Sequence, residues 1–585
     1  MLLKPIRFAT LVLSVLVTGL VSAQAQSAQP VREPHAVVVS IRALAAKTGV
    51  DIMKAGGNAV DAAVATGFAL AVIYPQAGNL GGGGFMLIRM KDGKTHFIDY
   101  REKAPAAATA NMYLDAHGNV IENASVVGYK AIGVPGSVAG MVYAEKKYGK
   151  LSLRQVMTPA IKLARDGFSL TANDAREMKN DKYLAQFPES RRIFQRDGHY
   201  YAEGDIFRQP ELAKTLERIA SDPADFYHGE MARQLAASVQ KGGGLISADD
   251  LAHYEVKERE PVRGTYRGYE VISAPPPSSG GTALVEILNI LEGYDLSKPR
   301  TRSAEDVHLT VEAFRRTYFD RAEFMGDSDF SKVPVAQLID KQYAAAWRES
   351  IDPAHASVSQ DLKRPAIFSQ LEQYAAQPVH SFHESPQTTH YSVVDSAGDA
   401  VAVTTTLNDG FGSRVTAEGL GFLLNDEMDD FSSKPGVPNL YGLIQGPANA
   451  IGPGKRPLSA MTPTIVLKDD KLFLVLGSPG GSRIITTVAN ILMGVVDYGM
   501  NIQQAVDAPR FHNQWLPDVV SLEESFPPEI AKSLEKMGHT VERGVTVGGE
   551  WEGQWSDGEC IAIEPKTGER LGASDSRNGG KAVGY

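Results

Sequence analysis

Two threonines and an asparagine fall close together at one end of a predicted β-hairpin. The turn of this hairpin centres between Ala397 and Gly398, and residues equidistant from the centre of an antiparallel hairpin face each other. Thr388 is therefore expected opposite Leu407, within one residue of Thr406, so contact between the two threonine hydroxyls is feasible. Asn408 lies two residues beyond Thr406 and shares its face if the strand continues. Taken alone, this pattern favours an ordinary interpretation, because β-strands are rich in threonine.

The elements that must position these residues alternate between hairpins and helices. The segment 60–73 is apolar nearly all round, which is typical of a buried helix. Further helices are predicted over 152–166, 209–221 and 303–321, and hairpins are predicted over 85–100, 389–407, 463–476 and 559–573. No repeat of fixed period and no long low-complexity linker is present. The pattern predicts an α+β layered sandwich in one integrated domain.

Residues 1–25 predict a secretory signal peptide. Lys4 and Arg7 precede a short apolar run, and a small-x-small cleavage pattern follows. We place the cut after Ala25, with Ala23 as the alternative. The apolar run is too short and too interrupted for a membrane anchor, and nothing later predicts a transmembrane helix. The chain is therefore expected in the periplasm or outside the cell.

Charge and composition exclude several classes of protein. The formal net charge is −10 and no basic stripe compensates it, which argues against a nucleic-acid partner. The single cysteine, Cys560, cannot form an internal disulfide and is predicted to be a small buried hydrophobe. The glycine runs at 81–84 and 480–481 lack the Walker spacing and lysine of a phosphate loop. We predict no cofactor and no metal.

Six separated motifs resemble those of the bacterial γ-glutamyltransferases, also called γ-glutamyltranspeptidases or glutathione hydrolases, which are N-terminal nucleophile hydrolases. The resemblance runs from about Ala36 to the C-terminus, and chance agreement of so many motifs in order is negligible. It implies a four-layer αββα sandwich built from both chains of a cleaved precursor. The motifs are Asp99–Glu102, Pro386–Val393, Leu424–Phe431, Lys455–Ser459, Gly477–Arg483 and Ala508–His512.

The resemblance implies that Thr388 first cuts its own chain at the Gln387–Thr388 bond. The Thr388 hydroxyl would attack the Gln387 carbonyl, an ester would form by an N-to-O shift, and water would open it. A threonine hydroxyl needs an adjacent base, and the freed α-amine, with a pKa of about 7.7–8.0, titrates near neutrality and would serve. The implied products are a large subunit, 26–387, and a small subunit, 388–585, which stay associated.

The resemblance also implies how a γ-glutamyl group would be held. Its free amino-acid head carries a carboxylate and an ammonium, so a site for it needs a cation and an anion held apart. Arg101 would grip the carboxylate through two parallel hydrogen bonds, and Asp430 would take the ammonium. Asn408 and Glu427 are implied near the ammonium and Ser459 near the carboxylate. Thr406, Gly480 and Gly481 complete the implied substrate contacts.

The same Thr388 would then attack the γ-amide of glutathione or a related γ-glutamyl compound. Water, an amino acid or a dipeptide would accept the γ-glutamyl group from the acyl-enzyme. Gly480 and Gly481 offer backbone N–H groups to the developing oxyanion, so catalytic roles are implied for both glycines, Thr388 and Thr406. The loop 435–442, which contains Tyr441, resembles a lid over the substrate.

One departure from the family pattern and two alternative functions remain. Family members usually carry two adjacent serines where this chain has Ser459 and Ala460, which puts the strength of substrate binding in doubt. A glutaryl-cephalosporin acylase on the same scaffold is one alternative, but glutaryl lacks the ammonium that Asp430 would bind. A noncatalytic secreted binding protein is the other, and the retention of Thr388, Thr406 and Arg101 together argues against it.

Overall fold

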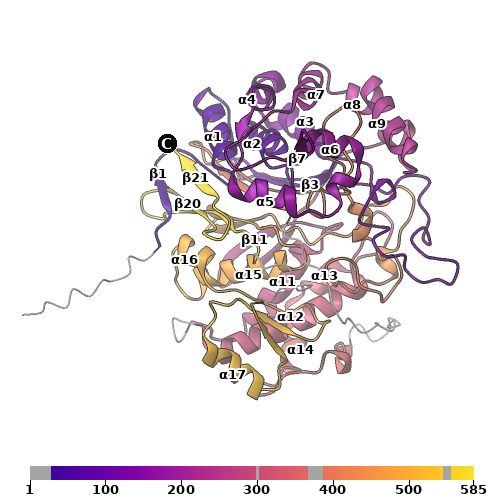
Figure 1. The fold of residues 1–585 in the computed structure, drawn as a ribbon. Helices are drawn as coiled ribbons and strands as arrows, with labels where there is room; N and C mark the ends of the chain where they lie inside the picture. The colour runs from indigo at the N-terminus through magenta and orange to yellow at the C-terminus, as the bar shows by residue number, and fades with distance from the viewer. Residues whose placement is uncertain (1–27, 298–301, 367–386, 545–554) are drawn as a thin grey trace, which may run out of the picture.

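A computed structural model describes residues 28–297, 302–366, 387–544 and 555–585 (Figure 1). The predicted signal peptide, residues 1–25, lies outside the described residues. Two seven-stranded sheets contain most of the strands, and all pairings within them are antiparallel. Within the described residues, no helix is both long and apolar enough to cross a lipid bilayer.

The first sheet carries the predicted nucleophile hairpin at its centre. Its strands, in spatial order, are β21 (Lys581–Gly584), β2 (Val37–Ser40), β12 (Thr389–Val394), β13 (Ala400–Thr406), β3 (Gly83–Arg89), β4 (Thr95–Asp99) and β9 (Lys257–Arg259). The second sheet contains β1 (Val31–Glu33), β20 (Arg570–Ser574), β19 (Glu559–Ile563), β15 (Lys471–Leu476), β14 (Thr464–Lys468), β11 (Tyr269–Ser273) and β10 (Val262–Tyr266). Both sheets therefore mix strands from before and after the Gln387–Thr388 bond.

Helices α1–α10 pack on the first sheet and α11–α17 on the second, so the two groups lie at opposite ends of the view in Figure 1. The first group is α1 (Ala43–Lys54), α2 (Ala59–Ile73), α3 (Ser137–Tyr148), α4 (Leu153–Asp166), α5 (Ala172–Asn180), α6 (Pro188–Phe194), α7 (Pro210–Ser221), α8 (Asp225–His228), α9 (Glu230–Lys241) and α10 (Ala248–Ala252). The second is α11 (Gly280–Leu291), α12 (Ala304–Phe324), α13 (Val335–Leu338), α14 (Lys341–Glu349), α15 (Arg483–Val496), α16 (Ile502–Asp507) and α17 (Pro528–Lys536).

The alternation of side chains along the strands explains the layers. Val38 packs against the first helical group, whereas Val37 and Val39 enter a core between the two sheets. In the second sheet Ile465 faces the same inter-sheet core and Val466 faces the second helical group. Because successive strand residues point to opposite faces, each sheet buries both sides. The result is the predicted α+β sandwich of four layers, helix, sheet, sheet and helix.

The predicted helices and hairpins form close to their expected bounds. The helix predicted over 60–73 is α2, and every one of its residues is buried. Ser152 and Ser303 accept hydrogen bonds from backbone N–H groups at the starts of α4 and α12, so each helix begins where a capping serine allows it. Cys560 is buried in the core below the second sheet, as expected.

Small strands complete the described structure. They form a three-stranded sheet and two short pairs at the periphery. Their bounds are β16 (Phe511–His512), β17 (Val520–Leu522) and β18 (Val541–Arg543), β5 (Phe168–Ser169) with β8 (Ile206–Phe207), and β6 (Gln195–Arg196) with β7 (His199–Tyr200).

Candidate active site

The hydroxyls of Thr388 and Thr406 are in contact at the start of β12. Their Oγ1 atoms are 3.0 Å apart, and the backbone N–H of Asn408 donates to Thr406 Oγ1 at 2.9 Å. Asn408 has a φ of +84°, a left-handed conformation uncommon outside glycine, which turns the chain sharply after β13. Thr406 is thus fixed by a backbone donor and keeps its own proton to donate. This pair is suited to positioning a nucleophilic hydroxyl.

The hairpin register differs by one residue from the prediction, because Thr388 faces Thr406 directly and not Leu407. The two strands are joined by a three-residue loop centred on Ala397. Its last residue, Gly398, has a φ of +88°, the left-handed conformation that such loops commonly adopt. A loop of three residues is centred on a residue and not on a bond, so the register shifts by one. The shift brings the two hydroxyls closer than predicted.

A pocket gathers nine of the eleven residues predicted for the site. The two others, Gly480 and Gln387, do not line it but directly precede the lining residues Gly481 and Thr388. The full lining is Arg101, Arg321, Thr388, Thr406, Asn408, Glu427, Asp430, Tyr441, Leu443, Ser459, Ala460, Met461, Gly481 and Ile484. One pocket therefore joins the hydroxyl pair to the charged residues.

Arg101 forms the centre of a buried charged cluster. The side chain is 1% exposed and contacts Glu427, Asp430 at 2.5 Å and Glu102 at 3.6 Å. Arg101 and Asp430 were expected to be held apart, one for each charge of a substrate, but they are paired with each other. A guanidinium taken out of water requires compensating charge nearby, which explains the pairing.

The two glutamates of this cluster favour retaining a proton. Burial raises the pKa of Glu102 to about 7, although Arg101 opposes the shift. Burial also raises the pKa of Glu427 well above its usual range, again against Arg101 and reinforced by Glu102. For Arg101, burial lowers the pKa, but Glu427 and Asp430 outweigh it and keep the guanidinium charged. The cluster therefore joins one cation to two glutamate carboxyl groups, Glu102 and Glu427, whose pKa values burial raises.

The loop between β15 and α15 presents two glycine N–H groups. Gly480 and Gly481 have φ values of +124° and +52°, which glycine adopts without strain. A Cβ at Gly481 would stand 2.5 Å from the ring of Tyr441, so the close approach also requires glycine. Within the described part of the chain, neither N–H has a hydrogen-bond partner. We call residues 477–482 the glycine loop.

Tyr441 covers the pocket from the loop that was predicted as a lid. Its hydroxyl donates to the backbone oxygen of Asn408 at 2.7 Å, and the residue is 4% exposed. Asn439 in the same loop accepts from the Tyr441 N–H at 3.1 Å and donates to Asp430 at 3.3 Å. The loop therefore contacts both ends of the pocket.

Four supporting residues were missed by sequence reasoning. Asn79 donates to the backbone oxygen of Thr406 at 2.9 Å, and Arg321 donates to Ser279 at 2.9 Å. Ser279 Oγ in turn donates to the backbone oxygen of Ser459 at 2.7 Å. His390 lies two residues after Thr388 on the same strand face, and its ring occupies the space where a Gly477 side chain would stand. Strand alternation could have indicated His390, whereas Asn79 and Arg321 required the tertiary fold.

The glycine-rich segment 81–84 packs closely against the backbone of two other segments. A Cβ on Gly82 would stand 2.1 Å from the backbone oxygen of Thr406, and one on Gly81 would stand 2.2 Å from that of Leu423. Side chains are excluded at these points because two backbones touch. The segment therefore holds β13 and its threonine in place.

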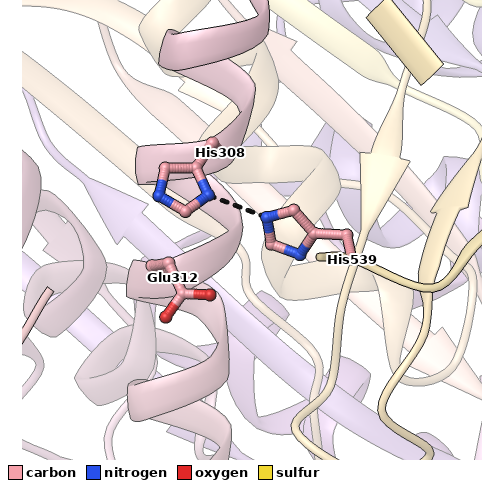
Figure 2. A group of neighbouring side chains, drawn as sticks. All are labelled: His308, Glu312 and His539. Atoms are coloured by element: carbon pink, nitrogen blue, oxygen red, sulfur yellow. Dashed lines mark hydrogen bonds between the residues drawn. The ribbon is translucent and has the colours of Figure 1, made fainter. Parts of the chain in front are cut away.

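His308, Glu312 and His539 form a cluster with the donor atoms of a metal site, all within 4.8 Å of one another (Figure 2). His308 Nδ1 and His539 Nε2 are 2.8 Å apart. The other His308 nitrogen must donate to the backbone oxygen of Asp352, at 2.8 Å, because a carbonyl only accepts. His308 Nε2 therefore carries a proton, and Glu312 pairs with two arginines, Arg316 at 2.6 Å among them. We assign the cluster to packing α12 against the chain before β18.

Comparisons with known proteins agree with this geometry. The gamma-glutamyltranspeptidase family model matches residues 45–585. A glutathione hydrolase proenzyme of Pseudomonas sp. (strain A14) is 51% identical over 532 residues, covering 90% of each chain. A chain of the Helicobacter pylori gamma-glutamyltranspeptidase crystal structure is 45% identical with a TM-score of 0.55, covering 57% of this chain and 96% of that one. A cephalosporin acylase from Bacillus halodurans is 28% identical with a TM-score of 0.81, covering 95% of this chain and 97% of that one. The resemblance of the motifs is thereby confirmed, and the chain belongs to the γ-glutamyltranspeptidase family.

Proposed function

We propose that Thr388 is the nucleophile with which this enzyme hydrolyses glutathione and transfers γ-glutamyl groups. The observation that carries the proposal is the 3.0 Å contact between Thr388 and Thr406, at one end of a pocket whose other end is the Arg101 cluster. Thr388 attacks the γ-carbonyl of a substrate while its own α-amine accepts the hydroxyl proton. Thr406 orients the attacking oxygen. Family membership makes the chain a γ-glutamyltransferase and glutathione hydrolase.

The tetrahedral intermediate places negative charge beside the glycine loop. The N–H groups of Gly480 and Gly481 stabilise that charge, and the collapse of the intermediate releases the amine. The γ-glutamyl-enzyme then passes its acyl group to water, an amino acid or a dipeptide. The substrate carboxylate takes Arg101 from its protein partners, and the ammonium binds Asp430 with help from Asn408 and Glu427.

The free α-amine of Thr388 requires cleavage of the Gln387–Thr388 bond. The precursor then becomes a large subunit, 26–387, and a small subunit, 388–585, that share one core. Support comes from the relative's designation as a proenzyme. The H. pylori chain adds support, since 57% of the present chain suffices to cover 96% of it. Export rests on the sequence pattern of residues 1–25 and leads to the periplasm or the exterior.

The acylase alternative is favoured by the likeness to a cephalosporin acylase. Against it stand the carboxyl groups of the buried Glu427 and the partly buried Asp430, which have no ammonium to bind in a glutaryl group. Comparing the hydrolysis of γ-glutamyl and glutaryl anilides separates the two activities. Equal or faster glutaryl turnover would reject the γ-glutamyl assignment.

Mass spectrometry of purified Thr388→Ala tests the nucleophile. The wild-type protein should give two chains, the smaller beginning at Thr388, whereas the variant should remain a single chain with activity reduced at least ~10⁴-fold, as is typical when a nucleophile is removed. Thr389→Ala is a matched control, because Thr389 is equally buried and its hydroxyl has no partner in the described structure. Cleavage in Thr388→Ala would overturn the proposal.

A further inference from the structure

Two buried carboxylates close to the glycine loop form no ion pair with any residue that the structure describes. Asp557 and Glu559 are two residues apart where the chain enters β19, so their side chains share a face. They are 1% and 0% exposed. Within the described residues, both carboxylate oxygens of Asp557 and Oε2 of Glu559 lack a hydrogen-bond partner, and so does Oδ1 of the neighbouring Asn578. Four oxygen atoms are thus buried without a donor.

The nearby arginines form their ion pairs with other carboxylates. Arg510 pairs with Asp575 at 2.5 Å, and Arg577 pairs with Glu523 at 2.5 Å as well as with Asp575 at 3.0 Å. Two arginines are therefore matched by two other carboxylates. Asp557 and Glu559 form no ion pair of their own within the described residues, and a buried carboxyl group of this kind either retains a proton or binds a cation.

A proton between the two carboxyl groups is one solution. Burial raises the pKa of Asp557, and the Asp575 charge adds to the shift. Burial likewise raises the pKa of Glu559, with Asp557 as the next cause. One shared proton, however, donates to a single oxygen and leaves the remaining oxygens unpaired. A cation is able to contact several of them at once.

We propose that Asp557, Glu559 and Asn578 form a binding site for Ca²⁺. Carboxylate and amide oxygens are the ligands that this hard cation prefers, at distances that tolerate irregular geometry. Zinc prefers nitrogen and sulfur ligands, none of which belongs to this set. The charge of a divalent ion would also balance the two carboxylates once they release their protons. The site is separate from the substrate pocket and from the histidine cluster of Figure 2.

The site is placed to hold the glycine loop. The backbone N–H of Asp557 donates to Ser478 Oγ at 3.1 Å. Ser556 Oγ stands 2.1 Å from where a Gly480 side chain would begin, so the two segments are in close contact. An ion bound by Asp557 and Glu559 fixes the segment that packs against the glycine loop. Loss of the ion should therefore slow the chemical step more than it weakens substrate binding.

Metal analysis and thermal unfolding of the cleaved enzyme test the site. Protein purified without chelator should contain about one Ca²⁺ per molecule. Removal of Ca²⁺ with EGTA should lower Tm by about 3 °C or more, because an ion that binds only the folded state stabilises it. Added CaCl₂ should restore Tm, and kcat should fall and recover in parallel while KM stays within twofold. MgCl₂ should restore less, since Mg²⁺ demands stricter geometry.

Variants assign the effect to these residues. Asp557→Asn should bind no Ca²⁺ and show no response to EGTA, and Asn578→Ala, a milder change at a half-buried residue, should require more CaCl₂ for the same Tm. Glu286→Gln is a matched control, because Glu286 is a buried carboxylate with an unpartnered oxygen that lies on α11, outside the site. It should respond to EGTA like the wild-type enzyme.

Two results would overturn the proposal. The first is an enzyme that contains no Ca²⁺ and whose Tm does not change with EGTA, while the Tm of Asp557→Asn at pH 7 equals or exceeds that of the wild type. This result would indicate that the two carboxyl groups share a proton instead of binding an ion. The other is an EGTA response that persists in Asp557→Asn, which would place the ion elsewhere.

Discussion

The two ends of the substrate pocket use different kinds of side chain. At one end, the neutral hydroxyls of Thr388 and Thr406 are arranged by backbone groups. At the other end, Arg101 is almost fully removed from water and pairs with Asp430, which is partly buried. A pair of hydroxyls can transfer a proton without creating net charge. In a buried ion pair the two charges interact strongly, and a charged substrate can take the place of one partner. The first end should therefore control the chemical step, and the second should control binding and stability.

Arg101→Ala tests the charged end and should have the largest effect among the substitutions that compare the two ends. It leaves Glu427 and Asp430 buried without a cation, so kcat/KM should fall about 10²–10³-fold, mainly through KM, and Tm should fall as well. Steady-state kinetics and thermal unfolding measure both. Arg101→Lys, which retains the charge but not the planar fork, should be intermediate. A loss confined to kcat would mean that Arg101 acts in chemistry, which would remove the contrast between the two ends.

Thr406→Val tests the hydroxyl end. It preserves shape but removes the hydroxyl that contacts Thr388, so kcat of the cleaved enzyme should fall about 10- to 100-fold, as for the loss of a positioned catalytic hydrogen bond. KM should stay nearly unchanged. Thr406→Ser restores the hydroxyl and should recover most of the rate. A rise in KM with normal kcat would show that Thr406 only binds substrate.

Glu102→Gln sharpens the comparison through pH. The folded-state pKa of Glu102 is raised to about 7 from its usual value of 4.5, so the folded protein holds more protons than the unfolded chain between these pH values. Stability should therefore fall as the pH rises through this window. Glutamine resembles the protonated form, so the variant should gain about 1–3 kcal/mol over wild type at pH 8 and little at pH 4. Denaturant unfolding at both pH values measures this, and an equal difference at both would contradict it.

Ala460→Ser should have the smallest effect. Ala460 lines the pocket beside Ser459, and a serine there adds one hydroxyl toward the substrate carboxylate. A single hydrogen bond contributes about 0.5–1.5 kcal/mol, so KM should fall about 2- to 10-fold with little change in kcat. An unchanged KM would show that Arg101 already satisfies the carboxylate.

Sequence patterns located the elements because the periodicity of apolar residues depends on local geometry alone. Helix α2 and the β12–β13 hairpin could be predicted in this way, but the register of the hairpin could not be predicted to the residue. The observed register differs by one residue from the prediction because Gly398 adopts a left-handed conformation. Several turn types of similar energy are available to such a loop, so its sequence does not select one of them.

The residues of the site were predictable mainly through motif resemblance. Periodicity alone identified Thr388 and Thr406 as neighbours without indicating a reaction. Arg321 and Asn79 reach the site only through tertiary packing, and nothing in their local sequence distinguishes them from other buried polar residues. The direct pairing of Arg101 with Asp430 also escaped prediction, because it depends on how thoroughly the fold excludes water.

The mixed strand order of the two sheets has a consequence for refolding and kinetic stability. The precursor folds as one chain, so β2 and β12 find each other as parts of a single molecule. The proposed cleavage at the Gln387–Thr388 bond would assign these strands to separate polypeptides, and reassembly from the unfolded state would then be a bimolecular reaction that depends on concentration. Refolding of the mature enzyme from its two separated chains would therefore be slow. Its lifetime would depend on the rate of unfolding more than on the equilibrium between folded and unfolded chains.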